Sequence, residues 1–420
     1  MKTFLPELSR SVVIQALAFG ALGVTAAAVL AQQKPPSPQE IEARKAMGGY
    51  FPERMKNPNL TGNPPKLTVT PVEEIPLKSI QVPPGFQVEI WAHGMPGARM
   101  MTRGDKGTVF VGTRTIGRVY AVMDKGGERT HRVIAEKLVQ PNGVLFVDGS
   151  LYIAAINRVF RYDNIEDALA QGNVPAPVDM TDAFKLPPDV HHNWKFLALG
   201  PDRKIYFQVG SPCNLCEINP GVHGQIRRYN LDGSGMEIMA RGVRNSVGFD
   251  FDPRTRDLWF TDNGRDWMGD DQPPDELNHL STAGEHFGFP FCHGDDIKDP
   301  DHNAGRACES FTRPARLLGA HVASIGMRFY TGTMFPDKYR NGIFIAEHGS
   351  WNRTTPVGYR VTFVKIEDNH ATSYEPFAYG WLKNGTASGR PADVLVMPDG
   401  SLLVADDKGG RIYRITYAGG

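Results

Sequence analysis

Cysteine, net charge and long apolar runs are all scarce in this chain, and each scarcity excludes a class of protein. Lysine plus arginine and aspartate plus glutamate both number 46, so the formal net charge is zero. The chain therefore lacks the charge that nucleic acid or an anionic membrane attracts, and we expect neither as a partner. Only four cysteines are present, and Glu217 follows Cys213-x-x-Cys216 where a haem attachment site needs histidine. Cys292 and Cys308 are too widely spaced to complete a zinc site with that pair.

The one long apolar run lies at the N-terminus, from Ser11 to Leu30, after two basic residues. Val29-Leu30-Ala31 is a small-residue cleavage pattern, so we interpret residues 1–31 as a secretory signal peptide. The mature protein is then expected in the periplasm, with no stable membrane insertion after cleavage. An uncleaved anchor is the alternative, because the run is close to the length that spans a bilayer. Residues 32–82 are polar and proline-rich, which is typical of a tether and lead-in rather than a domain.

In an exported protein, an even number of cysteines indicates disulfides. The pairs that are local in sequence are Cys213 with Cys216 and Cys292 with Cys308. We predict both as structural disulfides.

Glycine and proline are abundant, with 45 and 32 residues, and they separate short apolar runs. One pattern recurs six times from residue 97, as in "PNGVLFVDGSLYIAAINRVFRYD" and "ADVLVMPDGSLLVADDKGGRIYRITY". Six copies of a sheet-sized unit predict an all-β fold, a six-bladed β-propeller with four-stranded antiparallel blades over residues 83–420. A β-sandwich is the alternative, but it does not repeat the same turn chemistry six times. The stretch "QVPPGFQVEIWAHG" before the first copy is expected to complete the last blade and close the ring.

Loops at one face of a propeller converge on its central channel, so functional residues are expected at strand ends. The run "FTDNGRDWMGDDQPPDELN" at 260–278 is rich in carboxylates, which suit calcium, although it lacks the spacing of an EF-hand. A solvated acidic loop is an equal alternative. Arg244, Arg353 and Arg390 occupy similar positions in three blades, which indicates a site for carboxylates or a developing oxyanion.

Several motifs in order carry a family resemblance: "HHNWKFLALGPDRKIYFQVG", "RGVRNSVGFDFDP", "WFTDNGRDWMGDDQPPDELN", "GMRFYTG", "HGSWNR" and "RPADVLVMPDGSLLVADDKGGRIYRI". Together they resemble the glucose/sorbosone dehydrogenases, soluble quinoproteins that bind pyrroloquinoline quinone (PQQ) and Ca²⁺ on a six-bladed propeller. The resemblance extends from about residue 83 to residue 417 and is closest to the sorbosone and pyranose dehydrogenase branch. It implies oxidation of a sugar or sugar aldehyde by hydride transfer to PQQ, with electrons passed on to a cytochrome c or a quinone.

The resemblance assigns the catalytic base to His192, because the family's histidine stands eight residues before a Gly-Pro-Asp and here that triplet begins at Gly200. Neighbouring side chains on an extended segment point in opposite directions, so His192 and not His191 is expected to face the channel. A histidine with a pKa near neutrality suits the removal of a hydroxyl proton.

The resemblance also implies the cofactor and metal residues. Arg244 and Asn245 match the pair that contacts the reacting quinone carbonyl, and Arg244 is thus also assigned to catalysis. Asn263 is expected to bind the cofactor and begins the calcium segment, in which the carbonyls of Gly264 and Arg265 are the expected ligands. The remaining expected positions are Arg390 for a cofactor carboxylate, Arg353 in place of a family lysine, and His321 and Trp351 for the substrate.

Two positions depart from glucose dehydrogenase. Ser211 stands where that enzyme has the aspartate that orients its histidine, and Ala392 stands where it has a second cofactor arginine. Glucose itself is therefore not implied as the substrate. A calcium-dependent propeller lactonase and a non-catalytic binding propeller are the alternative functions, since fold alone does not determine function.

Overall fold

Six antiparallel sheets build the protein, in which the computed structural model describes residues 36–55 and 70–419. The predicted signal peptide lies outside the described residues. The first blade comprises β2 (Ala98–Arg103), β3 (Val109–Thr113), β4 (Val119–Lys125) and β5 (Glu128–Ala135). The second comprises β6 (Gly143–Val147), β7 (Ser150–Ala155), β8 (Arg158–Tyr162) and β9 (Val178–Asp179). The third comprises β10 (Leu197–Leu199), β11 (Ile205–Val209), β12 (Gln225–Tyr229) and β13 (Glu237–Arg241), to which the short parallel strand β17 (Glu285–His286) is added.

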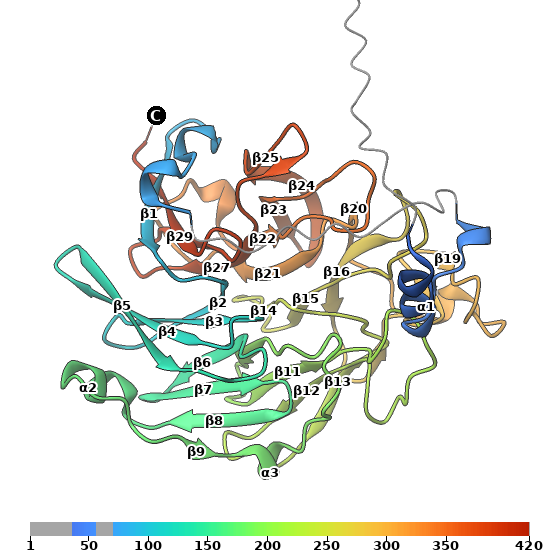
Figure 1. Cartoon of the computed structure of the whole chain (residues 1–420), viewed down its shortest axis with the longest axis horizontal. Coiled ribbons are helices and arrows are strands. Elements are labelled where there is room, and N and C mark those ends of the chain that lie inside the picture. The colour runs from blue at the N-terminus through green and yellow to red at the C-terminus, as the bar shows by residue number, and fades with distance from the viewer. Residues whose placement is uncertain (1–35, 56–69, 420) are drawn as a thin grey trace, which may run out of the picture. The chain divides into compact units, whose positions relative to one another are not determined.

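The other three blades complete the propeller (Figure 1). The fourth blade comprises β14 (Phe249–Phe251), β15 (Leu258–Asp262), β16 (Pro274–Leu280) and β20 (Arg316–Ala320). The fifth comprises β21 (Ser324–Phe329), β22 (Ile343–Glu347), β23 (Arg360–Glu367) and β24 (His370–Ala378). The sixth comprises β27 (Pro391–Val396), β28 (Leu402–Asp406), β29 (Arg411–Tyr417) and β1 (Phe86–His93). Two small hairpins stand outside the blades, β18 (Cys292–His293) with β19 (Ile297–Lys298) and β25 (Leu382–Lys383) with β26 (Thr386–Ala387). The six-bladed propeller predicted from the repeats is confirmed.

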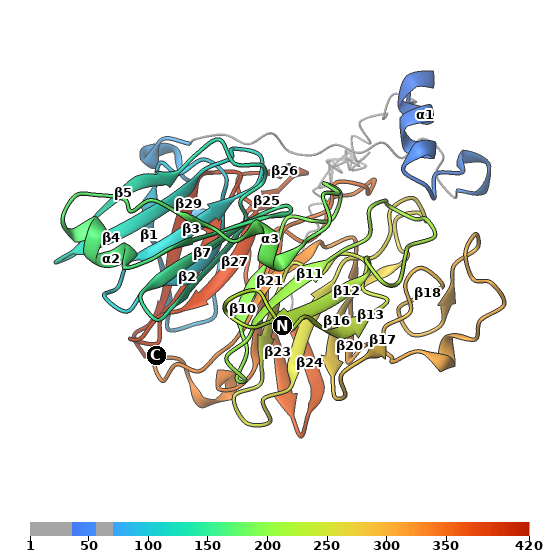
Figure 2. The same ribbon diagram turned by 90° about the horizontal axis from the view of Figure 1, so that it is seen from below.

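The ring closes by pairing strands from the two ends of the repeat region. β1 pairs antiparallel with β29, with Phe86 opposite Tyr417 and His93 opposite Arg411. The innermost strands of neighbouring blades contact one another: β2 contacts both β27 and β6, and Figure 2 shows β2 near β27. The closure expected from "QVPPGFQVEIWAHG" is therefore confirmed.

The hydrophobic core lies between adjacent blades rather than in one central mass. The second strand of five blades is buried along its whole length, namely β3, β11, β15, β22 and β28. Both faces of these strands are covered by neighbouring sheets, which explains why each reads in the sequence as a short continuous apolar run. The rings of Phe196 and Phe249, 4.9 Å apart, join the third and fourth blades in this way.

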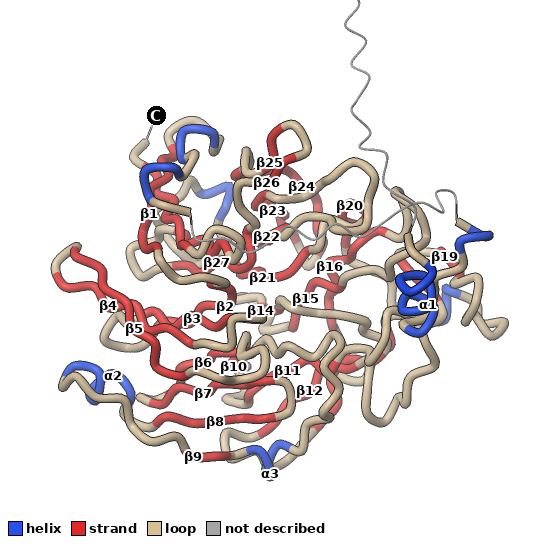
Figure 3. Tube along the Cα trace, in the orientation of Figure 1, coloured by secondary structure: helices blue, strands red, loops and turns tan. Residues whose placement is uncertain are grey.

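Among residues 36–55 and 70–419, helices are few and stand outside the sheets (Figure 3). They are α1 (Pro38–Ala46), α2 (Ile165–Ala170) and α3 (Thr181–Phe184), with short 3₁₀ turns at Pro52–Arg54, Val72–Glu74, Leu77–Ser79, Cys308–Ser310 and Asp337–Tyr339. In the described part of the chain, none is both long and apolar enough to cross a bilayer.

The described parts of the expected tether have structure of their own. Ser37 and Glu40 form a capping box at the start of α1, and Pro38 occupies its first turn. Tyr50 and Ile75 are buried, and the described residues from 36 onward belong to one unit. The polar, proline-rich composition does not reveal this, because Tyr50 and Ile75 are buried against propeller residues and not against each other.

Candidate active site

A cavity of about 290 Å³ lies among the loops where the blade strands end. This volume is at the lower end of the roughly 300–1,000 Å³ typical of small-molecule sites. Four arginines reach it, and the predicted residues Asn245, Asn263, Gly264, His321 and Trp351 also line it. The arginines are Arg99, Arg114, Arg244 and Arg390.

Arg99 and Arg390 are held by protein oxygens on one side of the cavity. Arg99 Nη1 donates to Asp407 Oδ2 at 2.6 Å and lies 3.4 Å from His348 Nε2. Arg390 Nε donates to the His348 carbonyl at 2.9 Å, and its Nη2 donates to the Gly349 carbonyl at 2.7 Å. Asp407 also accepts from His348 at 2.8 Å, so one carboxylate holds both an arginine and an imidazole at the wall.

Arg114 is different, because no ion pair or hydrogen bond holds its side chain within the described residues. Its guanidinium lies over the ring of Trp194, 3.8 Å from the centroid, and its Nε is buried without a hydrogen-bond partner. Burial, together with the charges of Arg99 and Arg390, lowers the pKa of Arg114 to about 10. An unpaired, desolvated cation is costly, so this wall of the cavity favours an anionic ligand.

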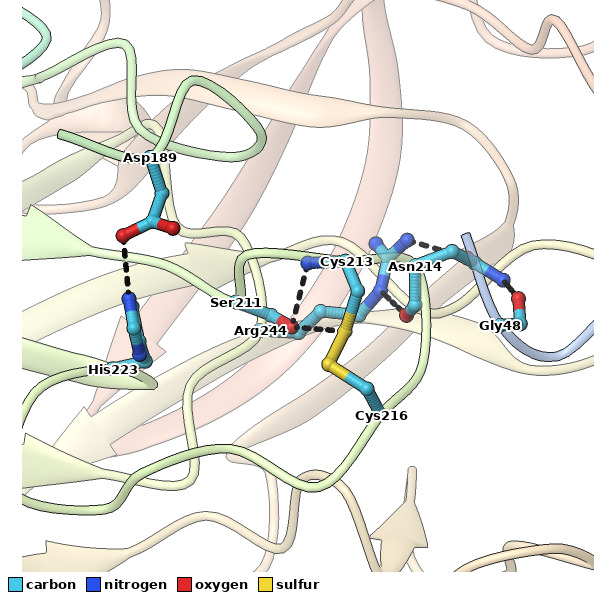
Figure 4. Close-up of a disulfide and its surroundings, with 8 residues drawn as sticks. All are labelled: Gly48, Asp189, Ser211, Cys213, Asn214, Cys216, His223 and Arg244. Atoms are coloured by element: carbon cyan, nitrogen blue, oxygen red, sulfur yellow. Dashed lines mark hydrogen bonds and ion pairs between the residues drawn. A yellow bond between two sulfur atoms is a disulfide. The ribbon is translucent and has the colours of Figure 1, made fainter. Parts of the chain in front are cut away.

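Arg244 lies at the centre of a network that joins three loops, and Figure 4 shows its contacts with Asn214. Its Nε and Nη2 donate to the carbonyl and side-chain oxygen of Asn214 at 3.0 and 2.8 Å, and its Nη1 donates to the Asn263 and Gly264 carbonyls at 3.0 and 2.8 Å. Asp266 lies 3.3 Å from Nη2. The guanidinium is therefore fixed by backbone and amide oxygens, with Asp266 as its one close carboxylate among the described residues.

Both histidines of the "HHN" motif line the cavity, so the expectation that His191 points away is wrong. The segment is not extended here: His192 has φ +48°, and the two ring centroids are 4.0 Å apart. Burial, with the charges of Arg244 and Arg114, lowers the pKa of His191 to about 4. Burial and Arg244 also hold the pKa of His192 well below its usual 6.5, and its Nδ1 has no hydrogen-bond partner among the described residues. The Ser211 hydroxyl lies 3.2 Å from Cys213 Sγ, beside the Cys213–Cys216 disulfide.

The acidic run at 260–278 braces loops. Asp262 accepts the backbone N–H groups of Arg244 and Asn245 at 2.8 and 2.6 Å, and Asp275 accepts those of Gly264 and Ser324 at 3.0 and 3.1 Å. Burial raises the pKa of Asp262 to about 6 and that of Asp275 to about 7. Asp262 and Asp275 are therefore buried supports of these loops, whereas Asp271 of the same run is exposed to solvent.

Comparison with known proteins supports the family. A sequence profile described as TrAA12-like matches residues 80–418. The chain belongs to the TrAA12-like family. A curated relative from Borreliella burgdorferi, described as an uncharacterized protein, is 36% identical over 357 residues, which cover 82% of this chain and 92% of its own. The resemblance to PQQ-dependent glucose/sorbosone dehydrogenases is confirmed as a family relationship.

Solved structures show the same fold at low sequence identity. The holo form of the PQQ domain of pyranose dehydrogenase from Coprinopsis cinerea has a TM-score of 0.67 at 19% identity, over 80% of this chain and 97% of that chain. The calcium structure of a Trichoderma reesei carbohydrate-active enzyme of family AA12 has a TM-score of 0.68 at 19% identity, over 81% of this chain and 97% of that chain.

In this TrAA12-like propeller, the carbonyls predicted to bind calcium do not by themselves form a calcium site. The Gly264 carbonyl accepts from Arg244 at 2.8 Å, and a guanidinium this close repels a divalent cation. The Arg265 side chain is buried against Asp299 at 2.7 Å. Within the described residues, no group of three or more histidine, cysteine, aspartate or glutamate side chains is arranged to hold a metal. Ca²⁺ takes about six to eight oxygens, so these two carbonyls would supply only part of that set.

Arg353 is not brought to the cavity with the other cations. Its side chain contacts the Asp270 carbonyl and lies 3.1 Å from Asp271 Oδ1, beside a separate depression near Val357. Arg99 and Arg114, with His348 and Trp194, occupy the cavity wall instead, and sequence reasoning missed all four. Ala392 lies at a buried position in β27, two residues after Arg390.

The two disulfides join Cys213 to Cys216 and Cys292 to Cys308, the local pairs expected from the sequence. The first closes the loop that carries Asn214, so it constrains a direct partner of Arg244. No free cysteine is present.

Proposed function

We propose that this TrAA12-like protein is a PQQ-dependent dehydrogenase that oxidises a small sugar or sugar aldehyde, with the cofactor bound in the arginine-lined cavity. The observation that carries the proposal is Arg114, a cavity cation that lacks an anionic partner among the described residues. PQQ carries several carboxylates, and a guanidinium fork matches the geometry of a carboxylate.

Other features of the cavity fit a flat, polar, anionic ring system. The indoles of Trp194 and Trp351 supply aromatic surface at its wall. Asn245 Oδ1, His192 Nδ1 and Arg114 Nε are buried without hydrogen-bond partners among the described residues. Buried polar atoms are normally satisfied, so three orphaned atoms at one cavity indicate a polar ligand.

The protein groups then have separate roles. When bound, PQQ supplies the two-electron acceptor for substrate oxidation. His192, neutral at pH 7 because of its low pKa, accepts the hydroxyl proton of the sugar or aldehyde hydrate. Arg244 presents a fixed positive charge toward the cavity, which stabilises negative charge that develops there. Arg114 and Arg390 orient the carboxylates. No step is assigned to calcium, because the chain alone does not complete its ligand set.

The test is reconstitution of the purified, cofactor-free protein with PQQ, with and without Ca²⁺. We expect stoichiometric binding, followed by absorbance, and reduction of an artificial dye when sugars or aldoses are added. Hydrolysis of a sugar lactone without PQQ would instead establish the propeller lactonase. Failure to bind PQQ would reject the proposed function, and failure to hydrolyse lactones as well would leave a binding propeller.

The proposal includes export and an external electron acceptor. Both disulfides are suited to an oxidising compartment such as the periplasm. The intact mass of the protein recovered from that compartment should lack residues 1–31. The reduced, reconstituted protein should in turn reduce a soluble c-type cytochrome or a quinone.

A further inference from the structure

Residues 38–50 form a segment that we call the N-terminal strap: helix α1 followed by Met47, Gly48, Gly49 and Tyr50. The strap precedes the part of the chain matched by the TrAA12-like profile, which begins at residue 80. It therefore lies outside the matched propeller, and its backbone hydrogen bonds to Asn214, Leu215 and Arg265 reach loops around the cavity.

The backbone of the strap docks on the disulfide loop and on Arg265. The Met47 carbonyl accepts the N–H groups of Asn214 and Leu215 at 3.0 and 3.4 Å. The Gly48 carbonyl accepts from Asn214 Nδ2 at 2.8 Å, as Figure 4 shows, and the Gly49 carbonyl accepts from Arg265 Nη2 at 2.6 Å. Three successive carbonyls thus have partners on the propeller.

Glycine is required at the docking point. Gly48 has φ +80°, and a Cβ built there would lie 1.7 Å from the Leu215 carbonyl oxygen. Gly49 has φ +77°, and its Cβ would lie 2.4 Å from Arg265 Nη2. A side chain at Gly48 would collide with backbone, so the strap can approach the disulfide loop this closely only with glycine there.

An aromatic contact fixes the end of the strap. Tyr50 is 1% exposed and packs edge-on against Trp267, with ring centroids 5.3 Å apart. Arg44 of α1 lies over the same indole at 4.7 Å from its centroid. Trp267 in turn packs edge-on against Trp351, a residue of the cavity wall, at 5.3 Å.

The strap therefore reaches the cavity by two routes. Met47 is itself part of the cavity wall. Asn214, which receives the strap, accepts from Arg244 through both its backbone carbonyl and its side-chain oxygen, at 3.0 and 2.8 Å. A displaced strap would open the wall at Met47 and free the amide that holds Arg244.

We propose that the N-terminal strap is the outer wall of the active-site cavity, limiting access to the cavity histidines, slowing release of the bound cofactor and positioning Arg244 through Asn214. The cofactor part of this inference rests on the proposed function, whereas the access part depends only on the described contacts.

Gly48→Ala in the full chain is the test, with Gly149→Ala as its matched control. Gly149 has the same φ of +80°, but a Cβ there meets no atom within 4 Å, so the control carries the backbone strain without the collision. The readout is the rate at which diethyl pyrocarbonate modifies His191 and His192 in cofactor-free protein, mapped by mass spectrometry and referred to the exposed His370. We expect modification to be faster by about tenfold or more in Gly48→Ala, because the strap opens locally. It should be unchanged in Gly149→Ala.

Cofactor release gives the second readout. PQQ should dissociate faster from Gly48→Ala by about the same factor, and at the parental rate from Gly149→Ala. Equal histidine modification in Gly48→Ala and the control would overturn the inference. If Gly48→Ala does not fold, Tyr50→Ala removes the aromatic anchor without touching the docked backbone and must give the same result. If PQQ binds to none of the proteins, the proposed function fails, and histidine modification still decides whether the strap is the wall.

Discussion

Replacing Arg114 by glutamine should change the stability of the cofactor-free protein and its affinity for PQQ in opposite directions. Burial lowers the pKa of Arg114 from 12.5 to about 10. Since one pKa unit is worth about 1.4 kcal/mol, the charge costs the folded state at most about 3.4 kcal/mol. Arg114 is partly exposed, so solvent screening reduces this to about 1–3 kcal/mol. Both the folded and the unfolded pKa lie far above 7, and the full cost is therefore present at neutral pH.

Glutamine also loses the contact of the guanidinium with Trp194, which at a partly exposed site is worth about 0.5–1 kcal/mol. The removed charge is the larger effect. We therefore expect Arg114→Gln to raise the free energy of unfolding of the cofactor-free protein by about 0.5–2 kcal/mol, as measured by urea denaturation at pH 7. Loss of a desolvated carboxylate partner should weaken PQQ binding by about 2–5 kcal/mol, or roughly 30- to 4,000-fold in Kd.

The control is Arg313→Gln, which removes the same charge from an exposed position outside the cavity lining. It should change the unfolding free energy by less than about 0.5 kcal/mol and leave the Kd unchanged. An Arg114→Gln protein that binds PQQ as tightly as the parent would refute the reasoning, and a less stable one would show that Arg114 has a structural partner.

Three further outcomes follow from the site. Burial and Arg244 keep the pKa of His192 below 6.5, so kcat/KM should no longer change with pH above about 6.5. His192→Ala should still bind PQQ but lose activity on the order of 10²–10⁴-fold. The activity of His191→Ala should stay within a few-fold of the parent. The opposite result would move the base to His191. Calorimetry should detect Ca²⁺ binding only after PQQ is added, and binding to the cofactor-free protein would contradict the ligand count. Burial and the Asp262 charge raise the pKa of Glu276 to about 8, above its ordinary 4.5. The contribution of the protonated Glu276 carboxyl to stability is therefore complete below about pH 4.5 and is lost as the pH rises through about 8. Glu276→Gln should accordingly match the parent in urea at pH 5 and exceed it at pH 9, and a parallel pH dependence of the two proteins would show that the carboxyl is ionised when folded.

The propeller was predictable because its determinants are local and repeated. Each blade contributes a short apolar run for its buried second strand, and turns such as Asp148–Gly149, with φ +48° and +80°, have the residues that a tight hairpin needs. The strap was not predictable in the same way. The capping box of Ser37 and Glu40 is visible in the sequence and indicates a helix, but nothing local tells where that helix docks. Its partner Asn214 lies more than 160 residues further along the chain.

The positions of the cavity residues follow the register of the repeats, although residue type alone does not reveal this. In four blades, the residue directly after the second strand reaches the cavity or holds a residue that does. These are Arg114 after β3, Asn263 after β15, His348 after β22 and Asp407 after β28. Strand ends at one face of a propeller converge on the channel, so equal positions in the repeat lead to the same place.

That rule explains why Arg353 was a wrong choice of cavity cation and His348 a missed one. Both belong to the loop after β22, but His348 follows Glu347 immediately, whereas Arg353 is five residues further along, where the chain has turned outward to Asp270 and Asp271. Charge alone favours Arg353. Position in the blade favours the imidazole, which Asp407 holds at 2.8 Å beside Arg99. In a repeat protein the geometry of the backbone is shared between blades while the side chains are not, so the register of the repeat locates a site residue more reliably than its chemical type does.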